Sequence, residues 1–393
     1  MTKSIPQLAT INDCTGCMAC VDSCSVHAIV SYRGDDGHLY VSVDQKSCVG
    51  CLQCEKTCQN RLNYKGNNKL EQSRPFAAWS KDAMLRSKST SGGVFAAIAV
   101  KVIQEGGVVI GAAFDGRYAR HIIIESQDDL YKIQGSKYVQ SNTEGIFKEI
   151  EKHLPNRRVL FSGVGCQVAA VLSFFANSPY KKNLYTMDLI CGGVPSDVLM
   201  EKYFATKPGL EAISSFRTKR KYELIGKVNG EEQPLGKHAL PLAGFAAELT
   251  NRFSCYHCQF AFAHRQSDIT IGDLWGEVGF EEERENGISL VIAHNERGEE
   301  LLKEAAVKYT SIEWKNFLYK NARLAIGETL MTLLRKRLEK NIKQMDNELF
   351  VETYTSTVTL EHPLLFLDRC FRKLKRRMEK RKHKSIINKL LSQ

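Results

Sequence analysis

Two short runs of cysteine carry the most specific chemistry in this chain. Both runs have the spacing C-x2-C-x2-C-x3-C, and they comprise Cys14, Cys17, Cys20 and Cys24, then Cys48, Cys51, Cys54 and Cys58. In this pattern the first three thiolates bind one cubane cluster, and the fourth binds the cluster of the other run. The spacing therefore predicts two [4Fe-4S] clusters. One would be held by Cys14, Cys17, Cys20 and Cys58, and the other by Cys48, Cys51, Cys54 and Cys24.

Zinc is the alternative metal for clustered cysteines. Zinc sites usually take C-x2-C pairs at wider separations, whereas here four cysteines fall within eleven residues, twice. Between the runs, alternating apolar residues flank the turn Arg33-Gly34-Asp35-Asp36-Gly37, which predicts a β-hairpin. We therefore expect residues 1–64 to form one duplicated α+β ferredoxin-type domain. Its few large apolar residues leave much of its stability to the clusters.

Five further cysteines lie outside these runs: Cys166, Cys191, Cys255, Cys258 and Cys370. Cys166 and Cys191 each follow an expected strand in a glycine-containing loop, and Cys255 and Cys258 form a C-x2-C pair. Four thiols from three loops are enough for a third cluster with all-cysteine ligation. The alternative is that single cysteines are small buried hydrophobic residues, and spacing alone leaves both readings open. Cys370 is expected to be unligated.

Composition and charge limit the class of protein. The chain has 393 residues, 43% hydrophobic and 25% charged, typical of a globular protein of two or three domains. No apolar run reaches the ~20 residues of a membrane-spanning helix, and the first ten residues lack a secretion signal. We therefore expect a cytoplasmic protein, in which clustered cysteines bind metal rather than form disulfides.

The net charge of +11 is concentrated at the C-terminal end. Residues 369–393 contain eleven Lys or Arg and one Glu, so the rest of the chain is close to neutral. Apolar residues recur at helical spacing in this tail, at Phe371, Leu374, Met378, Ile386, Ile387, Leu390 and Leu391. Such a basic amphipathic helix could lie on an anionic membrane, here the inner membrane surface, or dock an acidic partner. A solvated tail is the alternative, and the lack of interleaved aromatic residues argues against nucleic acid.

Strands and helices alternate after a polar linker at residues 63–74. We expect strands at Val108–Phe114, His121–Ile124 and Arg158–Phe161, and helices at Val94–Ile103 and Glu144–Leu154. This alternation predicts an α/β domain over residues 75–310. A helical region, beginning near residue 320 and ending in the basic tail at 393, follows it.

In its motifs, the sequence resembles the beta subunits of coenzyme F420 hydrogenases and dehydrogenases. The resemblance covers residues 75–310, with the ferredoxin-type domain as an N-terminal addition. Its landmarks are Ser91-Gly92-Gly93, Gly135 to Ser141, Gly163 to Gln167, Cys191 to Ser196, Phe216 to Lys219, and Cys255 through Asp268 to Gly276. The resemblance implies FAD and an iron–sulfur cluster in one α/β domain, and so favours the third cluster on Cys166, Cys191, Cys255 and Cys258. Two departures from the family pattern, Val164-Gly165 and Gly192, put the identity of the substrate in doubt.

The resemblance also implies where FAD binds. Taken alone, the Ser87–Gly93 loop before an apolar helix is either a phosphate site or an ordinary helix cap. Within the family it belongs to the FAD site, for which we expect Ser91, Gly92, Gly93, Ser136, Lys137, Tyr138, Gly163, Gln167 and Asp273. No catalytic residue is assigned. His257 and His264 are candidate proton relays, although either could be structural.

Three functions follow from these parts. The first is an FAD-dependent iron–sulfur oxidoreductase that passes electrons between a hydride substrate and a one-electron carrier, such as ferredoxin or a redox partner subunit. Coenzyme F420 or another small organic acceptor is the substrate that the resemblance implies. The second is an electron-transfer subunit without a substrate site of its own, serving a partner enzyme. The third is a non-enzymatic metal-binding protein.

Overall fold

The computed structural model describes most of the chain. It covers residues 4–60, 72–219, 221–236, 238–263, 265–275, 279–318, 320–321, 323–324 and 334–359, with single residues or pairs between 366 and 392. The expected linker at 63–74 lies mostly outside the described residues, so the proposed division between 64 and 75 stays a prediction. Among the described residues, no helix combines the length and apolar character needed to cross a membrane.

The N-terminal domain is built from two copies of the same turn. In each copy a short helix, α1 (Ala19–Asp22) or α2 (Gln53–Thr57), follows a residue with left-handed backbone, Met18 with φ 55° and Leu52 with φ 59°. Between the copies, β1 (Ile29–Arg33) pairs antiparallel with β2 (Leu39–Val43), as the sequence predicted. The duplication seen in the cysteine spacing therefore extends to the backbone.

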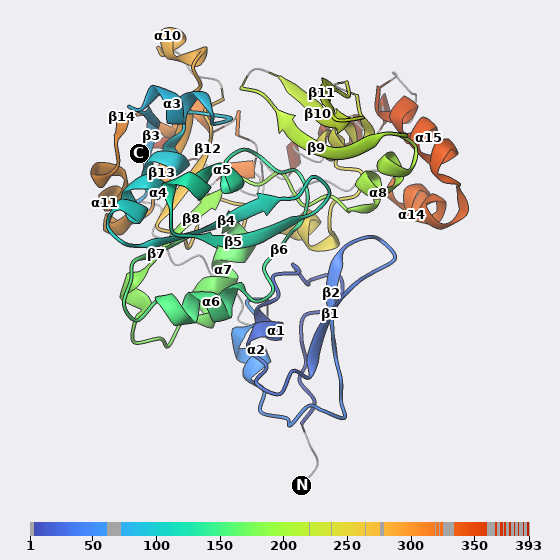
Figure 1. Cartoon of the computed structure of the whole chain (residues 1–393), viewed down its shortest axis with the longest axis horizontal. Helices are drawn as coiled ribbons and strands as arrows, with labels where there is room; N and C mark the ends of the chain where they lie inside the picture. Colours follow the sequence, from blue (N-terminus) through green and yellow to red (C-terminus); the bar gives the residue numbers. More distant parts are fainter. Residues whose placement is uncertain are drawn as a thin grey trace.

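A mixed sheet of nine strands forms the centre of the main domain (Figure 1). Its strand order is β14-β3-β13-β12-β8-β7-β4-β5-β6, and β12, β8, β7 and β4 run parallel to one another. The strands are β3 (Arg74–Ser80), β4 (Val108–Phe114), β5 (Ala119–Ile124), β6 (Ser141–Asn142), β7 (Val159–Val164), β8 (Leu184–Leu189), β12 (Ile269–Asp273), β13 (Ser289–Ala293) and β14 (Val307–Ser311). The fold class is therefore α/β, as expected.

Helices cover both faces of this sheet. Successive strand residues point to opposite faces, so Leu160 packs with α4 (Val94–Gln104) and α11 (Glu296–Glu304), whereas Val159 and Phe161 pack with α6 (Ile146–His153) and α7 (Gly165–Phe174). All three side chains are fully buried. Short helices complete the connections: α3 (Ala83–Ser87), α5 (Leu130–Ile133), α10 (Glu281–Arg284) and α12 (Trp314–Phe317).

A second, smaller layer has its own core (Figure 1). It consists of the antiparallel strands β9 (Leu210–Arg217), β10 (Tyr222–Val228) and β11 (Glu231–Pro234), together with α8 (Val198–Ala205), α9 (Leu240–Ala246), α14 (Arg335–Gln344) and α15 (Asn347–Thr359). The sequence patterns had not separated this sheet from the main domain. The last two helices pack against α8 and α9, so the C-terminal helical region closes a core begun more than a hundred residues earlier.

Candidate active site

A cavity of about 520 Å³ opens where the parallel strands of the main sheet end. The ends of β7 and β12 and the loop that follows β8 all contribute to its wall, at Val164, Asp273 and Cys191. Open α/β sheets bind ligands at the carboxyl ends of their strands, and the volume lies within the roughly 300–1,000 Å³ of small-molecule sites. The cavity is therefore the candidate active site.

Eight of the nine residues that the sequence assigned to FAD line this cavity. They are Ser91, Gly93, Ser136, Lys137, Tyr138, Gly163, Gln167 and Asp273. Gly92 is not among the lining residues. A Cβ at Gly92 would lie 2.5 Å from the carbonyl oxygen of Ala78 and 2.8 Å from the nitrogen of Ser289. This glycine therefore permits close packing of the loop against two strands.

Arg217 is the main lining residue that the sequence analysis left without a role. Its guanidinium pairs with both carboxylate oxygens of Asp273, at 2.6 and 3.1 Å, and donates to the carbonyl of Thr90 at 2.6 Å. The residue is only 6% exposed, and its Nε atom has no hydrogen-bond partner among the described residues. Arg217 thus links β9, the end of β12 and the Thr90 loop, and its Nε–H is a buried donor without a partner among the described residues.

Aromatic rings form one side of the cavity. Tyr138 stacks on Phe245 with ring centroids 4.4 Å apart and an interplanar angle of 22°, and it also meets Phe216 and Tyr222. Offset stacking of this kind offers a flat apolar surface on which a further planar ring could pack. Phe245 and Tyr222 come from the smaller layer, so that layer completes the site.

Two buried bases lie in the same wall. Burial lowers the pKa of Lys137 to about 7, and its Nζ donates to the carbonyl of Gln134 at 2.6 Å. Burial also lowers the pKa of His121 to about 4, so its ring is neutral at pH 7. The ring bonds to Ser141 Oγ at 2.8 Å and to the carbonyl of Ser162 at 3.1 Å. Lys137 is therefore the side chain in this wall whose charge changes near neutrality.

The four remaining candidate cluster ligands meet beside this cavity. Cys166 begins α7, Cys191 follows β8, and Cys255 and Cys258 lie in and just after a 3-10 helix at Phe253–His257. Burial, and then the neighbouring thiols Cys258, Cys191 and Cys255, raise the pKa of Cys166 well above its usual value. Mutual repulsion among thiolates is expected where several gather at one place. Cys166 and Cys191 also line the cavity.

The N-terminal thiols group as the crossed ligand pattern requires. Burial raises the pKa of Cys17 to about 11, and the nearby thiols of Cys14 and Cys58 also act to raise it. For Cys54, burial raises the pKa first, and the neighbouring thiols that add to it are Cys24 and Cys51. Cys58 thus joins the first run and Cys24 the second. Among the described residues, no group of three or more His, Cys, Asp or Glu side chains is close enough to hold a single metal ion.

The two N-terminal groups differ in their surroundings. Cys17 contributes to the raised pKa of Cys166 and packs against the core beneath α6 and α7. Cys51, in the other group, is exposed. We call the group of Cys14, Cys17, Cys20 and Cys58 the inner set and the other group the outer set. The inner set contacts the core of the main domain through Cys17, and the outer set is exposed at Cys51.

Buried contacts join the N-terminal domain to the main domain. Arg252, 1% exposed, donates to the carbonyl of Cys14 at 2.7 Å and lies over the Tyr40 ring at 4.5 Å. Asp22 accepts from the backbone nitrogens of Gly145 and Phe147, at 2.8 and 3.0 Å, where α6 begins. Of the candidate proton relays, His257 pairs with Asp13 at 3.2 Å on this boundary, and His264 lies outside the described residues.

Comparisons with known proteins agree with this arrangement. Residues 75–148 match the N-terminal part, and residues 156–317 the C-terminal part, of the coenzyme F420 hydrogenase/dehydrogenase beta subunit. Residues 13–61 match a 4Fe-4S dicluster domain, so the N-terminal domain is an iron–sulfur domain.

Individual relatives are distant. One of the subunits of the F(420)H(2) dehydrogenase of Methanosarcina mazei is 24% identical over 295 residues, covering 71% of this chain and 81% of the relative. The IorA subunit of indolepyruvate oxidoreductase of Archaeoglobus fulgidus is 47% identical over 49 residues, which is 12% of this chain and 7% of that protein. A chain of the F420-reducing [NiFe] hydrogenase complex from Methanosarcina barkeri has 18% identity and a TM-score of 0.46, with 71% of this chain and 91% of that chain covered.

The two beta-subunit matches together span more than half of the chain, and they include most of the residues that line the cavity, the Arg217–Asp273 pair and the loops of Cys166 and Cys191. The iron–sulfur domain precedes them, as the sequence analysis expected. This chain therefore belongs to the family of coenzyme F420 hydrogenase/dehydrogenase beta subunits, which are redox proteins.

Proposed function

We propose that the chain is an FAD-dependent iron–sulfur oxidoreductase that passes electrons between a hydride substrate and a one-electron carrier. One observation carries this proposal. A single cavity is lined at once by the candidate flavin residues, by two candidate cluster thiols, Cys166 and Cys191, and by Gly16 of the N-terminal domain. Two-electron and one-electron chemistry can therefore meet in one place.

The residues present fit FAD. The Nε of Arg217 and the Nε2 of Gln134 are buried donors without a partner among the described residues, and both residues line the cavity. Such donors are costly unless a ligand accepts from them. Ser91, Gly93, Ser136 and Lys137 would hold the pyrophosphate, and the stacked Tyr138 and Phe245 would face a planar ring. When bound, FAD supplies the exchange between a two-electron hydride and single electrons.

The protein side chains prepare this site in three ways. The Arg217–Asp273 pair fixes the Thr90 loop against the end of β12, so the loop is positioned before a ligand arrives. Gln167 accepts from the nitrogen of Val164 at 3.0 Å and donates to the carbonyl of Ser141 at 3.1 Å, which holds the loop of Cys166. The aromatic wall of Tyr138 and Phe245 excludes water from one side.

Iron–sulfur ligation follows the thiol groups described above. The inner and outer sets would each hold one [4Fe-4S] cluster, and Cys166, Cys191, Cys255 and Cys258 would hold a third. Because Cys166 lines the cavity and Cys17 lies near it, electrons would pass from the cavity to the third cluster, then to the inner set and the outer set. A soluble carrier or redox partner subunit would then meet the exposed Cys51 side.

The substrate is proposed from the names of two relatives and from the wall of the cavity. The names of the relatives mention F420, and coenzyme F420 or another small organic hydride carrier is the candidate here. Gly192 departs from the family pattern at a position where a Cβ would lie 3.2 Å from the Phe245 ring. A larger residue there would press on the Tyr138–Phe245 stack, so this departure shapes the wall that faces a substrate ring.

Anaerobic purification tests the proposal. The protein should carry FAD, and one of reduced F420, NADH, NADPH or reduced ferredoxin should bleach the flavin absorption band. Bleaching by a hydride donor with reduction of an artificial electron acceptor supports an enzyme with its own substrate site. Flavin binding without any hydride donor, combined with stable co-purification of a partner enzyme, would instead identify an electron-transfer subunit. Absence of flavin would leave only a metal-binding role.

A further inference from the structure

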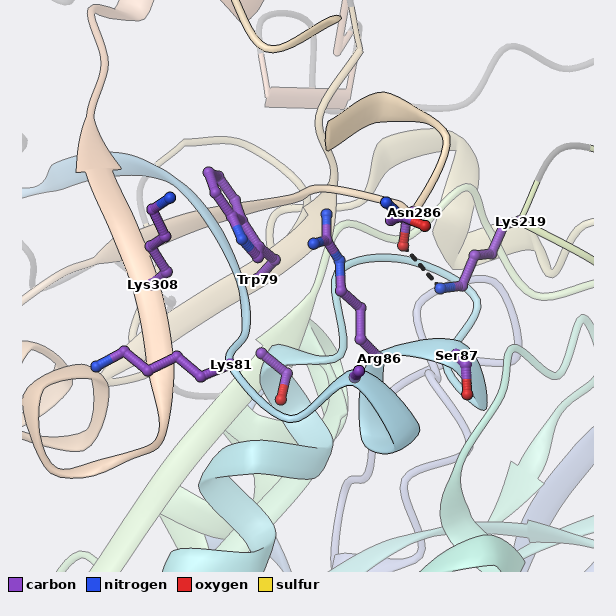
Figure 2. Close-up of a pocket in the computed structure, with 9 residues that line it drawn as sticks. Trp79, Lys81, Arg86, Ser87, Lys219, Asn286 and Lys308 are labelled. Atoms are coloured by element: carbon purple, nitrogen blue, oxygen red, sulfur yellow. Dashed lines mark hydrogen bonds between the residues drawn. The ribbon is translucent and has the colours of Figure 1, made fainter. Parts of the chain in front are cut away.

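A second cavity has a volume of about 430 Å³, and Figure 2 shows residues that line it. Its lining comes from the end of β3, from α3, and from residues near the ends of β9, α10 and β14. The lining residues are Trp79, Ser80, Lys81, Ala83, Arg86, Ser87, Lys219, Asn286 and Lys308. We call this cavity the basic pocket.

Positive charge is concentrated in the basic pocket. Four of its lining residues, Lys81, Arg86, Lys219 and Lys308, are cationic, and no Asp or Glu appears among the described residues that line it. Outside the C-terminal tail the chain is close to neutral, so this concentration is local. A concave surface of one charge sign raises the local concentration of oppositely charged ligands.

Two of the four cations are already committed to the fold. Arg86 pairs with Glu283 at 2.6 Å and donates from Nη2 to the carbonyl of Gly287 at 2.7 Å. Lys219 donates to the carbonyl of Asn286 at 2.7 Å, the contact drawn in Figure 2. Burial and the positive charge of Arg86 lower the pKa of Lys219. An anion in the pocket would relieve this repulsion.

The other two cations keep their ammonium groups available. Within the described part of the chain, the Nζ atoms of Lys81 and Lys308 have no hydrogen-bond or ion-pair partner, and both residues are exposed. Lys308 lies over the Trp79 ring at 5.3 Å, and Arg86 lies at the same distance from that ring. In Figure 2, Lys81 and Lys308 stand on one side of Arg86, and Lys219 with Asn286 stands on the other. A ligand with more than one negative group could contact both sides.

The basic pocket shares its walls with the candidate active site. On one segment, Ser87 lines the basic pocket and Ser89 lines the candidate active site. On another, Lys219 lines the basic pocket and Arg217 lines the candidate active site. On a third segment, Asn286 lines the basic pocket and Ser289 lines the candidate active site. Ser91 donates to the carbonyl of Ile288 at 2.9 Å, which joins two of these segments. The two cavities are therefore back to back.

We propose that the basic pocket is a binding site for the phosphate groups of a small phosphorylated molecule. Lysine ammonium groups bind phosphate as point charges, and a cavity of this size accepts a diphosphate with part of its carrier. The phosphate could belong to an arm of the hydride substrate held in the neighbouring cavity, or to a separate nucleotide. The phosphate site does not depend on the redox function proposed above. Only the assignment of the phosphate to an arm of the hydride substrate rests on that function.

Calorimetric titration of the full-length holoprotein with inorganic pyrophosphate tests the site without any turnover. The test variant is Lys81→Gln/Lys308→Gln, whose positions are exposed and outside the core. The matched control is Lys148→Gln/Lys152→Gln on α6, which removes the same net charge from exposed ion pairs elsewhere. Wild type and control should bind pyrophosphate equally, and the test variant at least about tenfold more weakly. Lack of binding by the wild type at low salt, or equal weakening in both variants, would overturn the site.

Steady-state kinetics then distinguish the two sources of phosphate. If the phosphate belongs to the hydride substrate, the test variant should raise the KM for that substrate several-fold and leave kcat nearly unchanged. If it belongs to a separate nucleotide, the KM should stay at the wild-type value while pyrophosphate binding is still lost. Because binding is measured without substrate, failure of the redox proposal leaves the first result unaffected.

Discussion

The guanidinium of Arg252 donates from Nε to the backbone carbonyl of Cys14 at 2.7 Å, across the boundary between the two domains. Its Nη2 lies 3.9 Å from the Sγ of the same cysteine. A buried cation therefore stands next to a candidate ligand of the inner set, and it also packs over Tyr40. A contact that helps to dock the domains therefore also contributes a positive charge to the surroundings of the inner set.

Replacing this arginine should affect both properties. In Arg252→Gln the carbonyls of Cys14 and Leu39 lose a buried donor, and we expect a loss of about 2–4 kcal/mol in the free energy of unfolding. Loss of the positive charge should also lower the reduction potential of the inner cluster, because the reduced cluster is more negative. Denaturant unfolding and an EPR redox titration measure the two effects.

Arg33→Gln is the control for this experiment. Arg33 also crosses the boundary, in an ion pair with Asp197, but within the described part of the chain no contact with a cysteine sulfur is found for it. Its replacement should reduce stability and leave the cluster potential unchanged. An unaltered potential in Arg252→Gln would show that the arginine has only a structural role.

Metal content tests the number of clusters. The twelve grouped cysteines predict about twelve iron and twelve sulfide per chain, and about eight would leave only the N-terminal pair. Cys255→Ser/Cys258→Ser should lose about four iron while the N-terminal clusters remain reducible. Cys370→Ser, at an exposed cysteine outside the groups, is the control and should keep the full content. Zinc without sulfide would refute the cluster assignment altogether.

The order of electron transfer can be tested at Cys166. This thiol lines the cavity and lies near Cys17, so a cluster that it holds would connect the flavin site to the inner set. In Cys166→Ser, hydride exchange between substrate and flavin should remain measurable, and reduction of the N-terminal clusters should slow strongly. Stopped-flow absorbance and rapid-freeze EPR follow the two steps. Reduction of those clusters at the wild-type rate would assign the third cluster to structure.

Flavin binding should depend on pH through Lys137. Its pKa of about 7 in the ligand-free protein means that the ammonium form prevails below pH 7 and the neutral form above. An anionic pyrophosphate stabilises the ammonium form, so FAD affinity should be constant below pH 7 and fall as the pH rises above it, with proton uptake on binding. Calorimetry in buffers of different ionisation enthalpy measures that uptake.

Lys137→Gln should remove this pH dependence and weaken binding below pH 7. Lys132→Gln, at an exposed lysine paired with Asp129, should retain the wild-type profile. If the Lys137 variant still shows the same dependence, another group is responsible for it.

The basic tail should bind anionic membranes. Phe366, Leu367, Phe371, Leu374 and Met378 are each more than 45% exposed, and they lie among many Lys and Arg residues. Ile386, Ile387 and Leu390 lie outside the described residues, whereas Leu391 packs against the core near Trp314. Deleting residues 369–393 should lower sedimentation with anionic liposomes and leave the flavin content unchanged. Equal sedimentation of the two proteins would exclude a membrane role, and neutral liposomes serve as the control.

Sequence reasoning succeeded where chemistry is encoded by local spacing. The two cysteine runs, the hairpin between them and the buried strands are all short-range patterns, and the structure contains each of them. Eight predicted flavin residues line one cavity because the loops that follow parallel strands meet at one edge of the sheet. Whether they bind FAD, and which thiols ligate which cluster, stays a prediction.

Long-range partnerships were beyond the reach of sequence patterns. Arg217 and Asp273 are 56 residues apart, and neither their pairing nor the role of Phe245 follows from any local signal. Gly92 was assigned to the flavin site by the family resemblance, and this stays a prediction; the structure adds that a Cβ at this position would meet the backbone of Ala78 and Ser289. This close packing depends on two strands that are distant in the sequence. The Ser/Gly composition of the loop could therefore not show whether the glycine serves packing or phosphate binding.

The duplicated N-terminal domain shows how two copies of one motif can become unequal without any change in their ligands. Both copies have the same cysteine spacing, and in both the residue before the helix has a left-handed backbone conformation. Both copies contact the main domain, but Arg252 adds a positive charge beside Cys14 of the first copy, whereas Cys51 of the second copy is exposed. Solvent exposure and nearby charge both influence the reduction potential of a cluster. These unequal surroundings would therefore give the two clusters unequal reduction potentials although their ligand spacing is the same.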